Sequence, residues 1–360
     1  MASAQSIPLT ARAALITSFT EPYLLKDDHP VTQPSELGPG QCLVKMEYAG
    51  VCHSDLHVRE GGWGPVKFPL VGGHEGIGRI LAIGAHTPPE RCPVKIGDRV
   101  GLKWIANACL NCEMCRTGNE PTCIVGLTTS HGYKVDGSFR DYAVSFVDYC
   151  TPIPDSLDGA AATPLLCAGV TVYKALKESK PKLGNWVAIP GAGGGLGHLG
   201  IQYAQAMGLR VIAIDTGDAK RDLCIKLGAE KFIDFKTSTN LVQDVKDATG
   251  GGAHSAVVVS PVPGPIEQAT EYLRMQGTLV IVGFPSGPVT FTVPIARMIA
   301  KCISIVGSAI GSRQDAIEAL ELAVRGKVSC HHEVRPFSDL NQAFAELGEG
   351  KVTGRLVVKM

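Results

Sequence analysis

The chain has 360 residues, of which 45% are hydrophobic and 19% are charged. This composition excludes an extended disordered chain, and the length predicts two domains rather than one. The 34 Lys and Arg residues balance 34 Asp and Glu residues, so the chain has no net positive charge with which to attract nucleic acid. It contains no apolar stretch of about 18 residues, and Met1–Thr10 lacks the pattern of a secretory or transit peptide. We therefore expect a cytoplasmic protein.

Short β-type runs separated by turn residues fill roughly the first 150 residues. Examples are the runs at 42–46, 78–83 and 99–102, with Gly- and Pro-rich turns at 38–40 and 61–65. This pattern predicts an irregular β domain with long loops.

Helical and strand patterns alternate from about residue 165 onwards, which predicts a parallel sheet with helical crossovers and an α/β fold class. After residue 305 we expect one helix, at 314–325, and a final strand at 354–358. The strands expected in the alternating region are 186–189, 210–214, 231–233, 255–259 and 278–282, and the helices are 171–178, 199–207, 219–227, 241–248 and 265–273.

A glycine-rich turn lies between the first strand and the second helix of this alternating region. Glycines allow a tight turn and close backbone approach, and a helix N-terminus attracts the pyrophosphate of a dinucleotide. The segment Gly195-Leu196-Gly197-His198-Leu199-Gly200 matches the G-x-G-x-x-G pattern literally. We prefer the register Gly194-Gly195-Leu196-Gly197 because it lies nearer the end of the strand.

Asp215 ends the next strand, 18 residues after Gly197. A carboxylate there accepts hydrogen bonds from ribose hydroxyls and repels a 2′-phosphate, which favours NAD over NADP. The alternative is that Asp215 caps a helix. Lys220 would flank the same ribose or be an ordinary solvated lysine.

Four of the 12 cysteines lie within 15 residues, in the pattern Cys109-x2-Cys112-x2-Cys115-x7-Cys123. Four thiolates around one ion suit tetrahedral zinc, and a site without an open position is structural. The alternative is four reduced cysteines without a metal.

A second group of metal-ligand residues lies in Cys52-His53-Ser54-Asp55-Leu56-His57 and Gly72-Gly73-His74-Glu75-Gly76, with Cys167 as a separate candidate. Two cysteines and one histidine form a known ligand set for catalytic zinc, which keeps a fourth position open. Spacing alone does not bring Cys52, His74 and Cys167 together, and taken singly Cys167 is a buried cysteine and His74 a loop histidine.

The neighbours of these ligands are candidates for the supporting chemistry. Ser54 would hold the reacting hydroxyl, His57 would pass its proton to solvent, and Asp55 would orient a ligand imidazole. Glu75 would tune or contact the metal. For Ser54 the alternative is a turn serine.

Together these motifs resemble the zinc-containing medium-chain alcohol dehydrogenases, most closely the tetrameric yeast and fungal enzymes. The resemblance covers nearly the whole chain and includes further motifs, among them Lys95-Ile96-Gly97-Asp98-Arg99-Val100-Gly101, Asp136-Gly137-Ser138-Phe139 and Leu166-Cys167-Ala168-Gly169.

The resemblance implies roles for specific residues. Cys52, His74 and Cys167 would bind the catalytic zinc, with Glu75 nearby, and the four clustered cysteines would bind the structural zinc. Ser54 and His57 match the two ends of a proton relay that passes through the cofactor ribose. The cofactor contacts implied are His53, Gly194, Gly195, Leu196, Gly197, Asp215, Lys220, Phe235, Val282, Phe284, Ser308, Ile310 and Arg355, and the alcohol pocket would be narrowed by Trp63 and Trp104.

The resemblance also implies a fold and an assembly. The expected fold is a GroES-like irregular β catalytic domain, 1–166 with 306–360, and a doubly wound parallel Rossmann domain, 167–305. The expected protein is a homotetramer that binds NAD and two zinc ions per subunit and interconverts alcohols with aldehydes or ketones by hydride transfer.

This chain also departs from the fungal pattern. Ser54 replaces the threonine typical of the fungal branch, the loop around Trp63 is one residue shorter, and Pro190 and Gly193 alter the phosphate turn. The added space beside Ser54 favours a substrate larger than ethanol.

Three alternatives remain open. The first is a polyol or aryl-alcohol dehydrogenase, or an aldehyde reductase, on the same scaffold. The second is a nucleic-acid binder with a zinc ribbon, which the zero net charge disfavours. The third is a relative that has lost its catalytic zinc.

Overall fold

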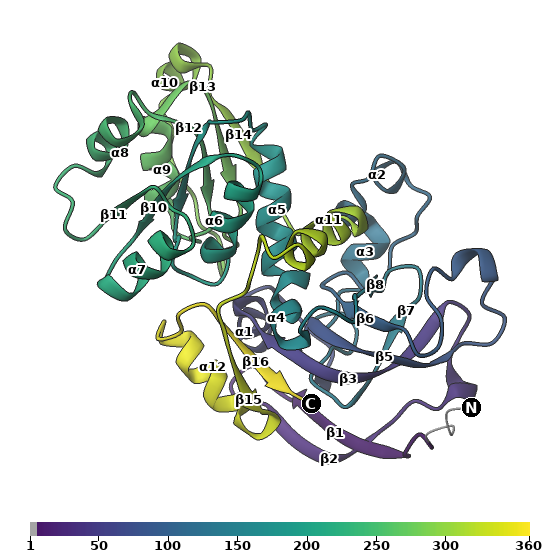
Figure 1. The fold of residues 1–360 in the computed structure, drawn as a ribbon. Coiled ribbons are helices and arrows are strands. Elements are labelled where there is room, and N and C mark those ends of the chain that lie inside the picture. Colours follow the sequence, from purple (N-terminus) through teal and green to yellow (C-terminus); the bar gives the residue numbers. More distant parts are fainter. Residues whose placement is uncertain (1–5) are drawn as a thin grey trace.

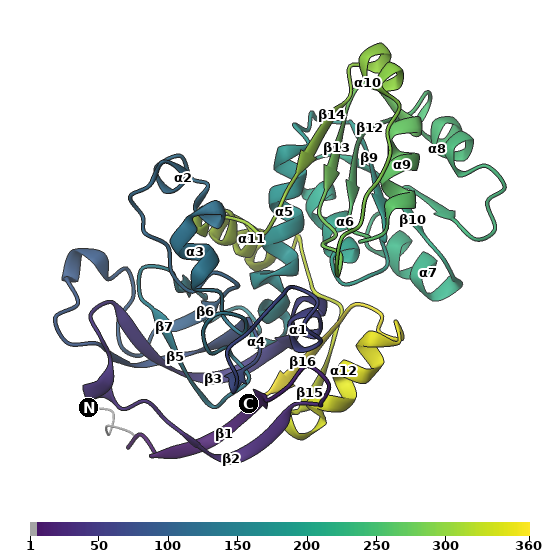
Figure 2. The same cartoon turned by 180° about the vertical axis from the view of Figure 1, so that it is seen from behind.

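The chain folds into two lobes, which lie side by side in Figure 1 and Figure 2. One lobe contains a six-stranded sheet, and the other contains a seven-stranded and a three-stranded sheet. The computed structural model describes residues 6–360; residues 1–5, which belong to the N-terminal segment read for targeting signals, lie outside them. Among the described residues no single helix is long and apolar enough to cross a membrane, although one bent pair, Gly159–Leu166 with Ala168–Glu178, passes the same test of length and composition.

One lobe is built on a six-stranded parallel sheet with the strand order β11-β10-β9-β12-β13-β14. In chain order this is the sequence 3-2-1-4-5-6 of a doubly wound dinucleotide-binding fold, and the strand order reverses between β9 and β12. The strands are β9 (Trp186–Pro190), β10 (Arg210–Asp215), β11 (Lys231–Asp234), β12 (Ala253–Val258), β13 (Leu273–Ile281) and β14 (Ser304–Gly307).

Helices cover both faces of this sheet (Figure 1), so its inner strands are apolar on both sides; every residue of β9 is buried. The helices are α5 (Ala168–Glu178), α6 (Gly197–Ala206), α7 (Asp218–Lys226), α8 (Leu241–Thr249), α9 (Pro263–Tyr272) and α10 (Ile295–Lys301). Asn240 caps α8 through its side chain, and Gly250 ends it in the left-handed conformation.

The other lobe contains a largely antiparallel sheet with the order β15-β16-β3-β5-β6-β8, in which β7 also pairs with β3, and a small sheet β2-β1-β4. The last strand of the chain, β16, pairs antiparallel with β3, so the C-terminal segment completes the N-terminal lobe. The strands are β1 (Thr10–Ile16), β2 (Leu24–Pro30), β3 (Gln41–Val51), β4 (Leu70–Val71), β5 (Glu75–Ile83), β6 (Arg99–Leu102), β7 (Tyr142–Phe146), β8 (Thr151–Pro152), β15 (His332–Pro336) and β16 (Arg355–Lys359).

The helices of this lobe are short, apart from the 12-residue α11, which follows the last strand of the parallel sheet. They are α1 (His53–Arg59), α2 (Glu113–Arg116), α3 (Ile124–Thr128), α4 (Gly159–Ala162), α11 (Arg313–Val324) and α12 (Leu340–Gly348). A capping box at Ser312, with Asp315 as the reciprocal partner, fixes the start of α11. The expectation of a single helix after residue 305 was wrong, because α12 follows α11; α12 is short and amphipathic and packs beside α1.

One continuous hydrophobic core joins the two lobes. It contains Ile77 and Leu166 from the β-rich lobe together with Leu199 and Val211 from the parallel-sheet lobe. Helix α5 lies at the junction and packs against α6 and α11. Residues that begin α5, including Cys167, are therefore held rigidly between the lobes.

Candidate active site and metal centres

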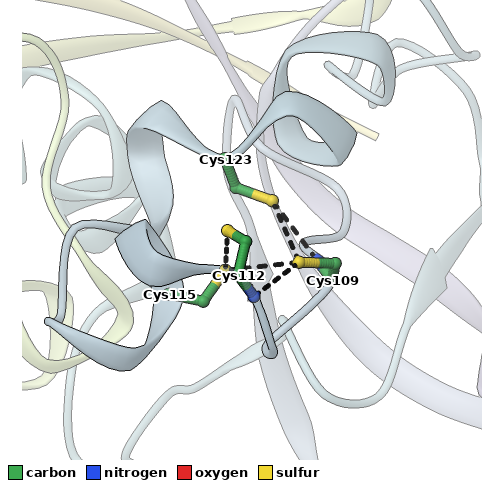
Figure 3. A group of neighbouring side chains, drawn as sticks. All are labelled: Cys109, Cys112, Cys115 and Cys123. Atoms are coloured by element: carbon green, nitrogen blue, oxygen red, sulfur yellow. Dashed lines mark hydrogen bonds between the residues drawn. The ribbon is translucent and has the colours of Figure 1, made fainter.

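The four clustered cysteines converge on one point, as Figure 3 shows. Their sulfur atoms lie within 4.8 Å of one another. Short elements present them: Cys112 precedes α2, Cys115 lies within it, and Cys123 precedes α3. Backbone N–H groups of Cys112 and Cys109 donate to the sulfurs of Cys109 and Cys123 at 3.2 and 3.4 Å, which is the environment that favours thiolates.

The spacing of these sulfurs fits a metal rather than disulfides. The Sγ–Sγ distances are 3.5 Å for Cys112–Cys115, 3.6 Å for Cys109–Cys123 and 3.9 Å for Cys109–Cys115. A tetrahedron with zinc–sulfur bonds of about 2.3 Å has sulfur–sulfur edges of about 3.8 Å, whereas a disulfide bond is about 2.05 Å long. The cluster therefore has the dimensions of a zinc–thiolate site with no open position.

A second cluster forms where three distant segments meet. Cys52 caps the start of α1, His74 lies between β4 and β5, and Cys167 lies between a 3-10 turn and α5. Ligand atoms of Cys52, His74, Glu75 and Cys167 lie within 4.8 Å of one another, and all four residues are buried. The three ligands that sequence spacing alone left apart are thus brought together by the fold.

The donor atoms of this cluster fit a buried cation. His74 Nδ1 is 2.8 Å from Asp55 Oδ1, whereas His74 Nε2 is buried without a hydrogen-bond partner among the described residues. An unpaired buried imidazole nitrogen is costly unless a metal occupies its lone pair. The Cys167 thiol, followed by the charge of Arg355 and by His74, lowers the pKa of Cys52 well below its usual value. The cluster thus offers one imidazole and two thiols, which is the Cys2His set.

Glu75 and Arg355 form a buried ion pair beside this cluster. Burial raises the pKa of Glu75 to about 8, with Arg355 opposing the shift, and one carboxylate oxygen, Oε2, has no hydrogen-bond partner in residues 6–360. Burial would lower the pKa of Arg355, but the charges of Glu75 and Cys52 outweigh it and raise that pKa. The ion pair keeps Glu75 next to the cluster without excluding it from the ligand set.

The relay candidates lie on α1. Ser54 Oγ is 3.7 Å from Cys52 Sγ, at the edge of the metal cluster. His57 lies one turn further, half-buried, and burial lowers its pKa. His53 is exposed, with its ring centroid 6.3 Å from that of His57. Both ends of the expected relay therefore face the same opening.

The glycine-rich turn joins β9 to α6. Gly194, Gly195 and Leu196 precede the helix, Gly197 is its first residue, and Gly200 lies inside it. A side chain at Gly197 would place Cβ 2.2 Å from the carbonyl oxygen of Gly191, so the turn closes only with glycine there.

Asp215 organises this turn from the end of β10. Its carboxylate accepts from the N–H groups of Gly193 at 2.8 Å and Thr216 at 2.9 Å, and from Lys220 Nζ at 3.1 Å. The next helix, α7, is capped by Gly217, so the alternative reading of Asp215 as its cap is wrong.

A single cleft of about 1310 Å³ runs between the lobes and connects the metal cluster to the glycine-rich turn. It lies at the carboxyl ends of the parallel strands, where doubly wound sheets bind ligands. Five of the expected site residues do not line this cleft: Asp55, Glu75, Gly197, Ser308 and Arg355. The expected site residues that do are Cys52, His53, Ser54, His57, Trp63, His74, Trp104, Cys167, Gly194, Gly195, Leu196, Asp215, Lys220, Phe235, Val282, Phe284 and Ile310.

Arg355 and Ser308 take positions that the sequence did not suggest. Arg355 is 5% exposed and packs against Gly195, but its guanidinium faces Glu75. Its contact with a pyrophosphate stays a prediction. Ser308 follows β14, and its buried hydroxyl has no hydrogen-bond partner among the described residues.

Aromatic rings wall the cleft beside the metal cluster. Trp104 packs edge-on against His74, with ring centroids 5.0 Å apart, and Trp63 packs against Trp104 at 5.4 Å and Phe284 at 4.9 Å. Tyr133 stacks on Trp104 and donates its hydroxyl to the Trp63 carbonyl. Sequence reasoning missed Tyr133; its place between the cysteine lobe and the Asp136-Gly137-Ser138-Phe139 motif was the only signal available.

The sequence matches two protein families. Residues 38–155 match the alcohol dehydrogenase GroES-like domain, and residues 195–325 match the zinc-binding dehydrogenase domain. The chain is 44% identical to an alcohol dehydrogenase of Schizosaccharomyces pombe and 43% identical to alcohol dehydrogenase 1 of Emericella nidulans, in both cases over 99% of each chain.

Solved structures show the same architecture. An acetophenone reductase from Geotrichum candidum, solved in complex with NAD, superposes with a TM-score of 0.84 at 27% identity and covers 99% of both chains. An alcohol dehydrogenase from Aeropyrum pernix superposes with a TM-score of 0.85 at 28% identity, over 97% of this chain and 100% of that one. The likeness covers both lobes.

Proposed function

The chain belongs to the zinc-dependent medium-chain alcohol dehydrogenases, and on that premise we propose which of its residues carry out the reaction and what they act on. The proposed active centre is the cleft-lining cluster of Cys52, His74 and Cys167, with NAD in the cleft between the lobes. The observation that carries this assignment is the buried, unpaired Nε2 of His74 beside two buried thiols.

Two metal sites per chain are proposed. Cys52, His74 and Cys167 would hold the catalytic zinc, and Cys109, Cys112, Cys115 and Cys123 the structural zinc. The sulfur–sulfur spacing of the second set supports this count. When bound, zinc at the first site lowers the pKa of an alcohol hydroxyl and the nicotinamide of NAD accepts a hydride.

The residues of the chain position the alcohol and move its proton. Ser54, beside Cys52, accepts the hydroxyl proton as it releases its own proton toward His57, and His57 delivers a proton to solvent from the outer side of α1. Asp55 keeps the His74 ring oriented, with Nε2 toward the thiols. Trp63 and Trp104 exclude water from the reacting carbon.

Asp215 and the turn around Gly195 would bind the cofactor. The Asp215 carboxylate, already held by Gly193 N–H, presents its charge where a ribose 2′-substituent would lie, which supports NAD over NADP. We propose 167–305 as the cofactor domain and 1–166 with 306–360 as the catalytic domain.

The proposed substrates are apolar primary or secondary alcohols larger than ethanol, including aryl alcohols. The aromatic walls of the cleft and the small side chain of Ser54 support this class, and the pocket walls offer few polar groups to pair with the hydroxyls of a polyol. A kinetic panel of ethanol, 2-propanol, benzyl alcohol, 1-phenylethanol and sorbitol, read at the NADH absorbance band, tests it. A preference for sorbitol would contradict the proposal.

The catalytic role of the cluster is tested with His74→Ala and Cys167→Ala. Each variant should lose alcohol oxidation while NADH still binds, because the ribose and phosphate contacts lie elsewhere in the cleft. Retained turnover in either variant would overturn the assignment. If NADH binding were lost together with turnover, the metal ligands and the cofactor contacts would not be separate sites.

A homotetramer is proposed as the assembly. The edge strand β14 is paired on one side only within residues 6–360, and the neighbouring α10 exposes Ile295 and Ile299. Unpaired strand edges and apolar side chains favour association between copies. Light scattering coupled to size exclusion tests the subunit number. The cytoplasmic location stays a prediction that cell fractionation would test.

A further inference from the structure

Three consecutive residues of the parallel-sheet lobe cross the cleft and contact the β-rich lobe. They are Phe284, Pro285 and Ser286, in the loop that follows β13. Phe284 packs edge-on against Trp63 with centroids 4.9 Å apart, and the Pro285 carbonyl accepts from Trp63 Nε1 at 3.3 Å. This bridging loop, 284–286, therefore contacts Trp63 through both a ring and a hydrogen bond, and fixes Trp63 at the wall of the proposed alcohol pocket.

The third residue of the bridging loop contacts the outer end of the relay. Ser286 Oγ is 2.6 Å from His57 Nδ1, a short hydrogen bond between residues far apart in the chain. No hydrogen bond to the other ring nitrogen, Nε2, is formed within residues 6–360. His57 lines the cleft, so its unbonded nitrogen remains available to a group bound there.

The chain leaves room for this contact. A Cβ atom on residue 62 would lie 2.8 Å from Ser286 Oγ, which is closer than Cβ atoms approach other heavy atoms in proteins. The N–H of Gly62 donates to the His57 carbonyl at 2.8 Å, so the glycine is tied to the same turn as His57. Glycine at position 62 thus leaves the space that the Ser286 hydroxyl occupies beside His57.

The hydrogen bond has a consequence for proton transfer. A neutral imidazole carries one N–H, and a serine hydroxyl can either accept from Nδ1–H or donate to an unprotonated Nδ1. Nε2 can take a proton from the cleft only while it keeps its lone pair, so the Nδ1–H form is the one that serves the relay. If Nδ1–H donates to Ser286 Oγ, then Nε2 keeps a lone pair and can accept a proton. Because Ser286 is exposed, the proton that leaves Nδ1 reaches water through its hydroxyl. One proton enters at Nε2, the Nδ1 proton passes to Ser286 Oγ, and the serine gives its own proton to water, so one proton reaches solvent. The ring is then the Nε2–H tautomer, and exchange of its protons with water restores the Nδ1–H form.

We propose that Ser286 is a positioning residue for the proton relay: its hydroxyl holds His57 in the Nδ1–H tautomer and forms the exit of the proton path. The proposal rests on the relay role of His57 in the proposed function. The titratable groups near His57 are Cys52, His53 and Glu60, all on its own segment, and neither Trp63 nor the bridging loop adds another.

The test measures the tautomer directly, in the full-length zinc-loaded protein without NAD. Histidine-selective ¹⁵N NMR distinguishes the Nδ1–H from the Nε2–H form, and a His57→Asn variant assigns the resonance. Ser286→Ala should shift His57 toward the Nε2–H form or a mixture, and Ser286→Thr should restore the original form. Ser338→Ala, an exposed serine that does not line the cleft, is the matched control.

Kinetics then connect the tautomer to the reaction. General-base catalysis is worth roughly 10²–10⁴-fold, and a positioning residue should account for a smaller part, about tenfold in kcat for alcohol oxidation near neutral pH. Ser286→Ala should also displace the pH profile of kcat in the same direction as His57→Asn, with NADH affinity unchanged and with Ser286→Thr close to the parent.

Two results overturn the proposal and are distinguishable. An unchanged His57 resonance in Ser286→Ala, with a pH-dependent defect in His57→Asn, removes Ser286 from the relay but keeps the proposed function. An unchanged pH profile in His57→Asn removes the relay itself, and Ser286 has then no relay to position.

Discussion

Replacing Asp55 by Asn should weaken the proposed catalytic zinc site without unfolding it. Asp55 is 1% exposed, and its Oδ1 lies 2.8 Å from Nδ1 of the fully buried His74. Asn keeps an oxygen that accepts from Nδ1–H, so the ring orientation survives while the carboxylate charge is lost. The substitution therefore tests one effect alone, which is how far the negative charge of Asp55 strengthens the His74 imidazole as a metal ligand.

The magnitude follows from that geometry. Loss of such an outer partner of a metal-bound histidine costs about 10–100-fold in metal affinity, or roughly 1.4–2.7 kcal/mol. Asp55→Ala should cost more, because it also leaves the buried Nδ1–H unpaired, at about 1–3 kcal/mol.

The assay is a chelator titration with zinc release measured by absorbance. Two phases are expected if the four-cysteine cluster holds the proposed second zinc ion, because that cluster would release its ion separately. Asp55→Asn should move only the phase that coincides with loss of turnover, and the exposed Asp27→Asn is the control. An unchanged midpoint for that phase would show that the Asp55 charge does not support the metal.

Three further predictions address the cofactor, the structural site and a buried lysine. Asp215→Ser should raise the preference for NADP over NAD by roughly tenfold in the kcat/KM ratio, since the carboxylate no longer repels a 2′-phosphate; an unchanged ratio contradicts its ribose role. Cys112→Ser should lose one zinc ion per chain and lower Tm by roughly 5–10 °C while turnover at 25 °C persists; loss of the catalytic zinc instead would show that the two sites are not independent. Burial lowers the pKa of Lys103 to about 8, so between that value and its ordinary pKa of 10.5 the unfolded chain binds more protons and stability rises with pH. The free energy of unfolding of the parent relative to Lys103→Met should accordingly grow by roughly 2 kcal/mol from pH 8 to pH 10 in urea titrations, and a constant difference would refute the shift.

Local patterns predicted the elements around the cofactor turn well. The strand at 210–214 and the helix at 219–227 lie within one residue of β10 and α7, because apolar runs between glycine-rich turns leave few alternatives. The four-cysteine lobe was equally predictable, since its ligands are neighbours in the chain.

Elements without an amphipathic signal were missed. Strand β2, Leu24–Pro30, has the sequence LLKDDHP and exposes most of its residues, so it shows no apolar alternation. Helix α12 was missed for a different reason: its apolar residues do follow helical spacing, but the helix is only nine residues long, and so short a pattern is a weak signal.

The catalytic cluster marks the limit of prediction from spacing. Cys52, His74 and Cys167 come from a helix start, a loop and a second helix start, and only the tertiary fold brings them together. Resemblance to a family named them, whereas physical reasoning from spacing left them unconnected. The contacts Glu75–Arg355 and His57–Ser286 could not be predicted from the sequence either. Each joins segments that come together only in the folded chain.

Zinc-edge anomalous diffraction from crystals of the active full-length enzyme would locate both proposed metal ions. Two peaks per chain are expected. One should lie among the sulfurs of Cys52 and Cys167 and Nε2 of His74, and the other among the four clustered sulfurs. A single peak in fully active crystals would show that the chain holds one zinc ion, and a cleft peak away from Cys52, His74 and Cys167 would show that other residues hold the catalytic metal.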